Sequence, residues 1–216
     1  MNPAASTDDD LIAWLMQGDP AIRWQTMRDL LDLPEADWQA ERRLTLQAGW
    51  GKHYLELQAA DGSWGGGIYS PKWVSTTYTL LTLCAIGIPR DHPPAVNAAA
   101  LVLERELGST CDDQFMRNLE GMDRCIVGMD LQIAAYFELR DGRIAAMLEN
   151  LLAERMADGA WNCRRPDGTW SVQHKYPGRS FFDMEKVCGP SRWNTLRALR
   201  VLKWWESQES PAVKSK

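Results

Sequence analysis

The sequence lacks a long apolar run and an excess of basic residues. In its 216 residues, the longest apolar stretches, such as residues 80–86, are far too short to cross a bilayer. The acidic N-terminus has no apolar stretch of the kind found in signal peptides. The net charge of −5 argues against binding to a nucleic-acid phosphate backbone, which requires clustered Lys and Arg. We therefore expect a cytoplasmic protein with no transmembrane segment and no nucleic-acid partner.

Several common signatures are also absent. The five cysteines are odd in number, and without an export signal they are expected to be reduced rather than joined in a disulfide framework. The triplet Gly65–Gly67 is not followed by Gly-Lys-Ser/Thr, so it is not a phosphate-binding loop. No Gly-x-Ser-x-Gly nucleophile motif occurs. The chain is still long enough to form an apolar core without disulfides or metal.

What the sequence does have is helical periodicity and 11 tryptophans, against 4 phenylalanines and 5 tyrosines. Apolar residues recur at steps of three and four almost throughout, and strand-like alternation is nearly absent. Asp19 followed by Pro20 is a strong helix start. The pattern predicts an all-α protein with helices at residues 20–33, 35–58 (interrupted at 49–51), 71–87, 94–107, 125–139, 142–156 and 191–205, with polar loops at 108–123 and 164–190.

One turn occurs twice. Residues 57–64, Leu-Gln-Ala-Ala-Asp-Gly-Ser-Trp, resemble residues 154–161, Glu-Arg-Met-Ala-Asp-Gly-Ala-Trp. After each turn come a loop and a helix led by tryptophan, at Trp73 and at Trp193. The segment between them is a degenerate copy. Such repeats indicate helical hairpins that bury their apolar faces by stacking on their neighbours.

The turn Leu57-Gln-x-x-Asp-Gly-Ser-Trp-Gly65 resembles the Gln-Trp repeat of squalene and oxidosqualene cyclases, and it is equally similar to repeats in the β subunits of protein prenyltransferases. The resemblance is closest to the small prokaryotic members of this group. It implies an (α/α) toroid, with inner helices that begin near Arg23, Trp73, Cys125 and Trp193. The chain has fewer repeats than these families use, so we expect an incomplete or open toroid that a homodimer could close. We expect a single repeat domain over residues 11–205, between a flexible N-terminus (1–10) and a flexible tail (206–216).

The prenyltransferase resemblance implies a zinc site. In that family an Asp-x-Cys at the start of an inner helix and a later histidine hold the metal, which activates a substrate thiol. Here Asp123 and Cys125 match the first part of the pattern. The later helix has no histidine, and either Cys188 or His174 could replace it. There are two alternatives. Loop cysteines, including Cys111 and Cys163, could form a structural zinc site instead, or the cysteines are small, buried, reduced core residues.

The cyclase resemblance implies an acid and an aromatic cavity. Squalene–hopene-type cyclases protonate an alkene with an Asp-x-Asp-Asp motif, whose nearest match here is the incomplete Thr110-Cys-Asp-Asp113. Aromatic faces can stabilise carbocations. The inner-helix aromatics are candidates to line a ligand cavity, although large aromatics also fill helix interfaces as core. They are Trp73, Tyr78, Tyr136 and Trp193. Trp64 and Trp161, in the repeat turns, are expected to be structural.

Two functions remain open. The first is a terpenoid cyclase/prenyltransferase-like protein that binds an isoprenoid or other lipophilic small molecule between its inner helices, with or without catalysis. The second is a non-catalytic α/α repeat scaffold that binds a protein partner. An apolar, dead-ended cavity would favour the first, and a solid core the second.

Overall fold

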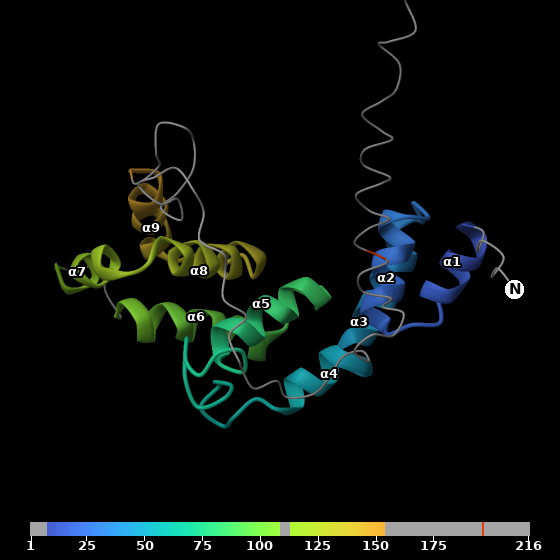
Figure 1. Ribbon diagram of the computed structural model, residues 1–216, viewed down its shortest axis with the longest axis horizontal. Helices are drawn as coiled ribbons and strands as arrows, with labels where there is room; N and C mark the ends of the chain where they lie inside the picture. The colour runs from blue at the N-terminus through green and yellow to red at the C-terminus, as the bar shows by residue number, and fades with distance from the viewer. Residues whose placement is uncertain (1–7, 109–112, 154–195, 197–216) are drawn as a thin grey trace, which may run out of the picture. The chain divides into compact units, whose positions relative to one another are not determined.

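The computed structural model describes residues 8–108, 113–153 and 196 (Figure 1). Over these residues the chain is helical and contains no strand, which confirms the all-α prediction. The described helices are α1 (Asp8–Leu15), α2 (Pro20–Asp29), α3 (Glu35–Arg43), the 3₁₀ turn η1 (Leu44–Leu46), α4 (Gly49–Glu56), α5 (Thr76–Ile86), α6 (Pro93–Leu107), α7 (Asp113–Gly121), α8 (Arg124–Tyr136) and α9 (Gly142–Ala153). Among them none is long and apolar enough to span a membrane. The toroid stays a prediction, because the second copy of the repeat turn lies outside the described residues.

The chain divides into two compact units. Unit 1 comprises residues 1–56, 86–89 and 182–216, and unit 2 comprises residues 57–85 and 90–181. The single repeat domain expected over residues 11–205 therefore contains two units. That they act as one domain stays a prediction.

In unit 1, α2 begins as its sequence predicts. Asp19 is the N-cap residue, and its Oδ1 accepts a hydrogen bond of 2.8 Å from the backbone N–H of Ala21. Pro20 follows at the first helical position, where a missing N–H costs nothing. Oδ2 of Asp19 accepts a second bond of 2.7 Å from the backbone N–H of Trp50. One side chain therefore caps α2 and fixes α4 beside it.

Trp24 is the centre of the packing in unit 1. Its ring is 3% exposed, and its indole N–H donates to the carbonyl of Ile86 at 2.9 Å. The Arg28 guanidinium stacks over the ring at 4.6 Å, and that of Arg42 at 5.3 Å. Arg42 also donates to the carbonyls of Gly87 and Ile88. These contacts explain why residues 86–89 belong to unit 1.

In unit 2 the repeat turn closes around Trp64. Asp61 Oδ1 accepts hydrogen bonds from the backbone N–H and the hydroxyl of Ser63. Gln58 donates to the carbonyls of Gly62 and Pro94, which joins the turn to the start of α6. Trp64 itself is fully buried, so the structural role expected for it is confirmed.

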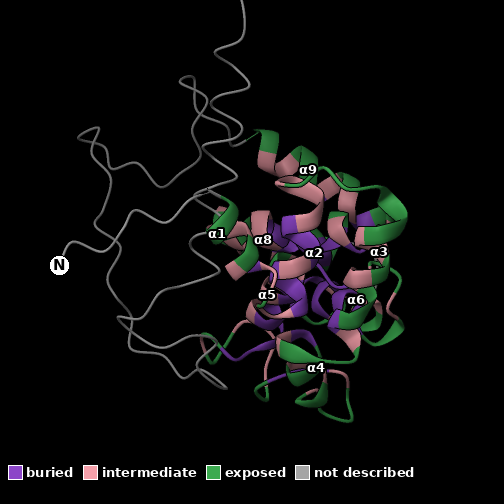
Figure 2. Cartoon of the chain, turned by 90° about the vertical axis from the view of Figure 1, so that its right-hand side faces the viewer, coloured by how far each residue is buried: buried purple, intermediate pink, exposed green. Residues whose placement is uncertain are grey.

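The core of unit 2 lies between α6, α7, α8 and α9. Buried residues of α5 and α6 are purple in Figure 2. The cluster at the centre combines residues that are less than 2% exposed, and partly buried apolar side chains pack around it. Its members are Leu103, Leu107, Phe115, Leu119, Val127 and Met147.

Several boundaries differ from the sequence prediction. The break predicted at residues 49–51 lies earlier, after α3, because α4 begins at Gly49; α2 ends at Asp29 and α8 at Tyr136, each before its predicted end. α5 begins at Thr76, not at residue 71, because the preceding loop satisfies its first donors: Thr76 N–H bonds to Gly67 and Thr77 N–H to Ile68. The predicted loop at 108–123 contains α7, whose Phe115 and Leu119 are buried one turn apart. Part of the expected flexible N-terminus, from Asp8, belongs to α1.

Candidate functional site

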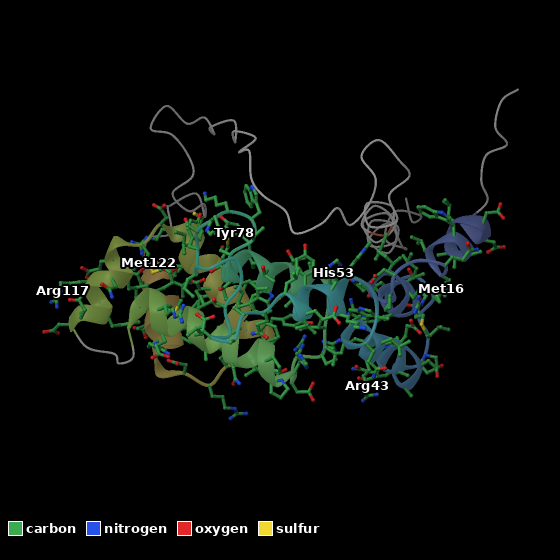
Figure 3. All side chains as sticks on the ribbon, turned by 90° about the horizontal axis from the view of Figure 1, so that it is seen from below. Met16, Arg43, His53, Tyr78, Arg117 and Met122 are labelled. Atoms are coloured by element: carbon green, nitrogen blue, oxygen red, sulfur yellow. The ribbon has the colours of Figure 1, made fainter. Side chains whose placement is uncertain are left out.

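Three aromatic side chains of unit 2 form a cluster at the start of α5. The ring centroids of Trp73 and Tyr78 are 4.8 Å apart in an edge-to-face arrangement, and those of Tyr69 and Tyr78 are 5.4 Å apart. The ammonium group of Lys72 lies 5.1 Å from the centroid of Tyr69. Trp73 is 44% exposed, which is high for the largest apolar side chain. We call Tyr69, Trp73 and Tyr78 the aromatic cluster; Tyr78 is labelled in Figure 3.

The loop before α5 positions this cluster. Ser75 donates its hydroxyl to the carbonyl of Tyr69 at 2.9 Å. Thr76 Oγ1 donates to the carbonyl of Gly67 at 2.8 Å and accepts from the backbone N–H of Trp64 at 3.0 Å. Gly65 adopts a φ of +60°, a conformation that L side chains rarely adopt. The glycine-rich sequence and the hydroxyl residues after it therefore fold the loop back over the helix start. This places Trp73 in the loop, outside the helix face on which it was predicted.

Cys125 lies close to the aromatic cluster. Burial raises the pKa of the Tyr78 hydroxyl; a hydrogen bond with Tyr69 and the negative charges that Tyr69 and Cys125 carry when ionised raise it further. Cys125 is exposed in the first turn of α8. The structure therefore places Trp73 against Tyr78, and it brings Cys125 within electrostatic reach of Tyr78. The sequence assigned the two aromatic residues to ligand binding and Cys125 to metal binding.

Of the predicted zinc ligands, only Asp123 and Cys125 lie among the described residues. Asp123 is the N-cap residue of α8, its side chain makes no capping hydrogen bond, and it is exposed like Cys125. Cys188 and His174 lie outside the described residues. Across residues 8–108, 113–153 and 196, no group of three His, Cys, Asp or Glu side chains could hold a metal ion. Two donors alone do not make a tetrahedral site, so zinc stays a prediction and no chemistry is assigned to it.

Tyr136 does not join the aromatic cluster. It lies at the far end of α8, about 16 Å from Cys125 along the helix axis at 1.5 Å per residue. There it packs edge-on against Phe137, and Arg90 lies over its ring at 5.4 Å. Trp193, the fourth predicted aromatic, lies outside the described residues, as do Trp161 and Asp112. Asp113 is exposed at the start of α7.

Asp130 is a candidate that the sequence analysis missed. It lies on α8 and is 1% exposed, and neither carboxyl oxygen has a hydrogen-bond partner among the described residues. Burial, and secondarily the charge of Glu106, raises the pKa of Asp130 to about 8. A signal was present: Asp130 follows Val127 by three residues and precedes Ile133 and Ala134 by three and four, on the apolar face of the helix.

Comparison with known proteins finds no matching protein family, no similar curated protein and no similar solved structure. The resemblance to cyclases and prenyltransferases therefore rests on the residues of the repeat turn.

Proposed function

We propose that the chain is a terpenoid cyclase/prenyltransferase-like protein that binds an isoprenoid or other lipophilic small molecule at the aromatic cluster. The observation that carries this proposal is the exposure of Trp73 beside Tyr78. A large apolar ring left in water is costly, and its edge-to-face contact with a tyrosine holds it in a defined position.

The position of the cluster supports this function. It lies at the start of α5, and the charge of Cys125 at the start of α8 acts on it; α5 and α8 are two of the described helices that the repeat would place on the inside of a toroid. Apolar ring faces suit a hydrocarbon chain, and the Lys72 ammonium could attract an anionic head group such as a diphosphate. The proposal assigns binding and leaves the chemical step, if there is one, unassigned.

Calorimetric titration with farnesol and with farnesyl diphosphate tests the proposal. We expect Trp73→Ala to weaken binding about tenfold or more, because it removes an aromatic contact surface. Met116→Ala is the matched control, since Met116 is an apolar side chain with similar exposure, 42%, on α7 of the same unit. If neither compound binds the full chain, or if Trp73→Ala and Met116→Ala bind equally well, the proposal is wrong.

The repeat-scaffold alternative is favoured by a different surface. Leu148 and Leu152 lie one turn apart on α9 and are 47% and 51% exposed. The partner would be a second copy of the chain, as an open toroid suggests. Light scattering after size-exclusion chromatography should then give the mass of two chains. Leu148→Glu should convert it to one chain, and a single-chain mass for the unmodified protein would contradict this alternative.

A further inference from the structure

Asp130 is the buried acidic group of unit 2 for which the function proposed above has no use. It lies in the middle of α8, on the side that packs against α6 and α9. An ionised carboxylate in such a position would have lost its water and gained no donor in return. Proteins avoid that state by keeping the group neutral or by moving it.

A second carboxyl group, that of Glu106, acts electrostatically on Asp130. Glu106 lies in the last turn of α6, and burial raises its own pKa. Its charge is the electrostatic influence that acts on Asp130 in addition to burial. Two carboxyls on packed helices cannot both ionise without repulsion. A proton on either carboxyl would remove this repulsion between α6 and α8.

Among the described residues, the positively charged side chains on α6 and α9 are paired with other carboxylates and do not neutralise Asp130. On α6, Arg105 pairs with Asp61 at 3.0 Å, and its side chain is 42% exposed. On α9, Arg143 pairs with Asp141 at 2.6 Å, and Glu149 is exposed.

The other titratable groups near α8 are also engaged elsewhere or uncharged. On α8 itself, Arg124 donates to Asn150 and to the carbonyl of Glu120. α5 has Tyr78 and Cys84 as titratable groups and no Asp, Glu, Lys or Arg.

We propose that the packing of α8 against α6 depends on a proton carried by Asp130, and that loss of this proton loosens the two helices. The carboxyl is neutral in the packed state, and the exchangeable proton is released to solvent when it ionises. The contact between α6 and α8 then weakens over the pH range in which Asp130 would lose its proton.

The sign of the effect follows from proton linkage. The pKa of Asp130 is about 8 in the folded chain against an ordinary value of 3.8. Between these values the unfolded chain has released the proton while the folded chain retains it, so rising pH favours unfolding. Below this range both states are protonated, and above it both are ionised, so the loss of stability occurs within it. For one proton the folding equilibrium constant falls about tenfold per pH unit.

Urea unfolding of the full chain at pH 5, 6 and 7 tests the proposal. We expect the folding constant of the unmodified protein, relative to Asp130→Asn, to fall about tenfold per pH unit. Glu106→Gln should reduce this dependence and keep part of it, because burial is the larger cause. Glu149→Gln, which changes an exposed carboxylate on α9, should leave it intact. Parallel curves for the unmodified protein and Asp130→Asn would overturn the proposal.

Two measurements on the unmodified protein keep the test decisive if Asp130→Asn does not fold. Carboxyl ¹³C NMR should show one aspartate that titrates near pH 8. Hydrogen exchange, corrected for its intrinsic pH dependence, should show less protection of α8 amides at pH 9 than at pH 6. If every carboxyl titrates below pH 6, or if α8 protection is equal at both pH values, the proposal is wrong.

Discussion

The two units each contain a substantially buried aspartate, and they treat it in opposite ways. In unit 1, Asp19 accepts hydrogen bonds from two backbone N–H groups and lies near Arg23. In unit 2, Asp130 has no hydrogen-bond partner among the described residues, and the charge that acts on it is that of another carboxylate, Glu106. Burial raises the pKa of both groups, but hydrogen bonds and a cation oppose that rise at Asp19 alone. A buried carboxylate that is surrounded by donors can stay ionised and support the fold. One without donors is expected to need a bound proton to stay buried.

The largest effect that would sharpen this comparison is expected from Trp24→Ala in unit 1. The substitution removes a nearly buried ring, its hydrogen bond to Ile86 and the surface on which Arg28 stacks. We expect the free energy of unfolding to fall by about 3–5 kcal/mol. Hydrogen exchange followed by mass spectrometry should locate the lost protection in α2, α3 and residues 86–89. Retained protection there would contradict the central role of Trp24.

The control for this experiment is Trp38→Ala. Trp38 lies 5.9 Å from Trp24 between ring centroids, and it is more exposed than Trp24. Trp38→Ala changes the same residue type in the same unit, but it leaves the hydrogen bond from Trp24 to Ile86 in place. Its cost should therefore be clearly smaller than that of Trp24→Ala. Equal costs would mean that the hydrogen bond and the burial of Trp24 contribute little.

Much of the fold could be predicted because the signals are local. Asp19 followed by Pro20 is a capping sequence whose hydrogen bond to Ala21 needs no distant partner. The Asp-Gly-Ser-Trp turn likewise depends on Asp61 bonding to Ser63 two residues away.

The missed features depend on distant or competing contacts. Trp73 fits the apolar face of a helix by spacing, but Gly67 and Ile68 take up the first N–H groups of α5 and place the helix start at Thr76. α7 is polar overall and buries just Phe115 and Leu119, so composition indicated a loop.

The candidate site was predictable in its members and not in its assembly. The sequence named Trp73, Tyr78 and Cys125, but not that a loop would pack Trp73 against Tyr78 or that the charge of Cys125 would act on Tyr78. Asp130 was overlooked because an acidic residue within a helical segment is usually solvated. Its position among apolar residues at helical spacing would have identified it.

The next largest effect concerns the satisfied aspartate. Asp19→Ala should lower the free energy of unfolding by about 1–2 kcal/mol at neutral pH, because the N–H groups of Ala21 and Trp50 lose their acceptor. Urea unfolding at pH 7 measures this change. Asp19→Asn retains a side-chain acceptor and should recover part of the loss. The comparison between the units fails if Asp19→Ala is neutral, because the hydrogen bonds would then not distinguish Asp19 from Asp130.

The smallest effects are expected from one ion pair in each unit, and they extend the comparison from buried to exposed charges. In unit 1, Arg23 and Glu41 are 2.6 Å apart, with side chains 27% and 20% exposed. In unit 2, Arg90 and Glu138 are 3.0 Å apart, with side chains 53% and 70% exposed. Water and salt screen the second pair more strongly. Glu41→Gln should therefore cost about 1 kcal/mol, and Glu138→Gln should cost less than about 0.5 kcal/mol.

Urea unfolding at low and at high salt distinguishes the two pairs. The cost of Glu138→Gln should vanish when salt is added, because both partners are largely in water. Most of the cost of Glu41→Gln should persist, because Arg23 also donates to the carbonyl of Gly18 at 2.7 Å and is held in place without its partner. If Glu138→Gln cost more than Glu41→Gln, exposure to solvent would not determine how much an ion pair stabilises this chain.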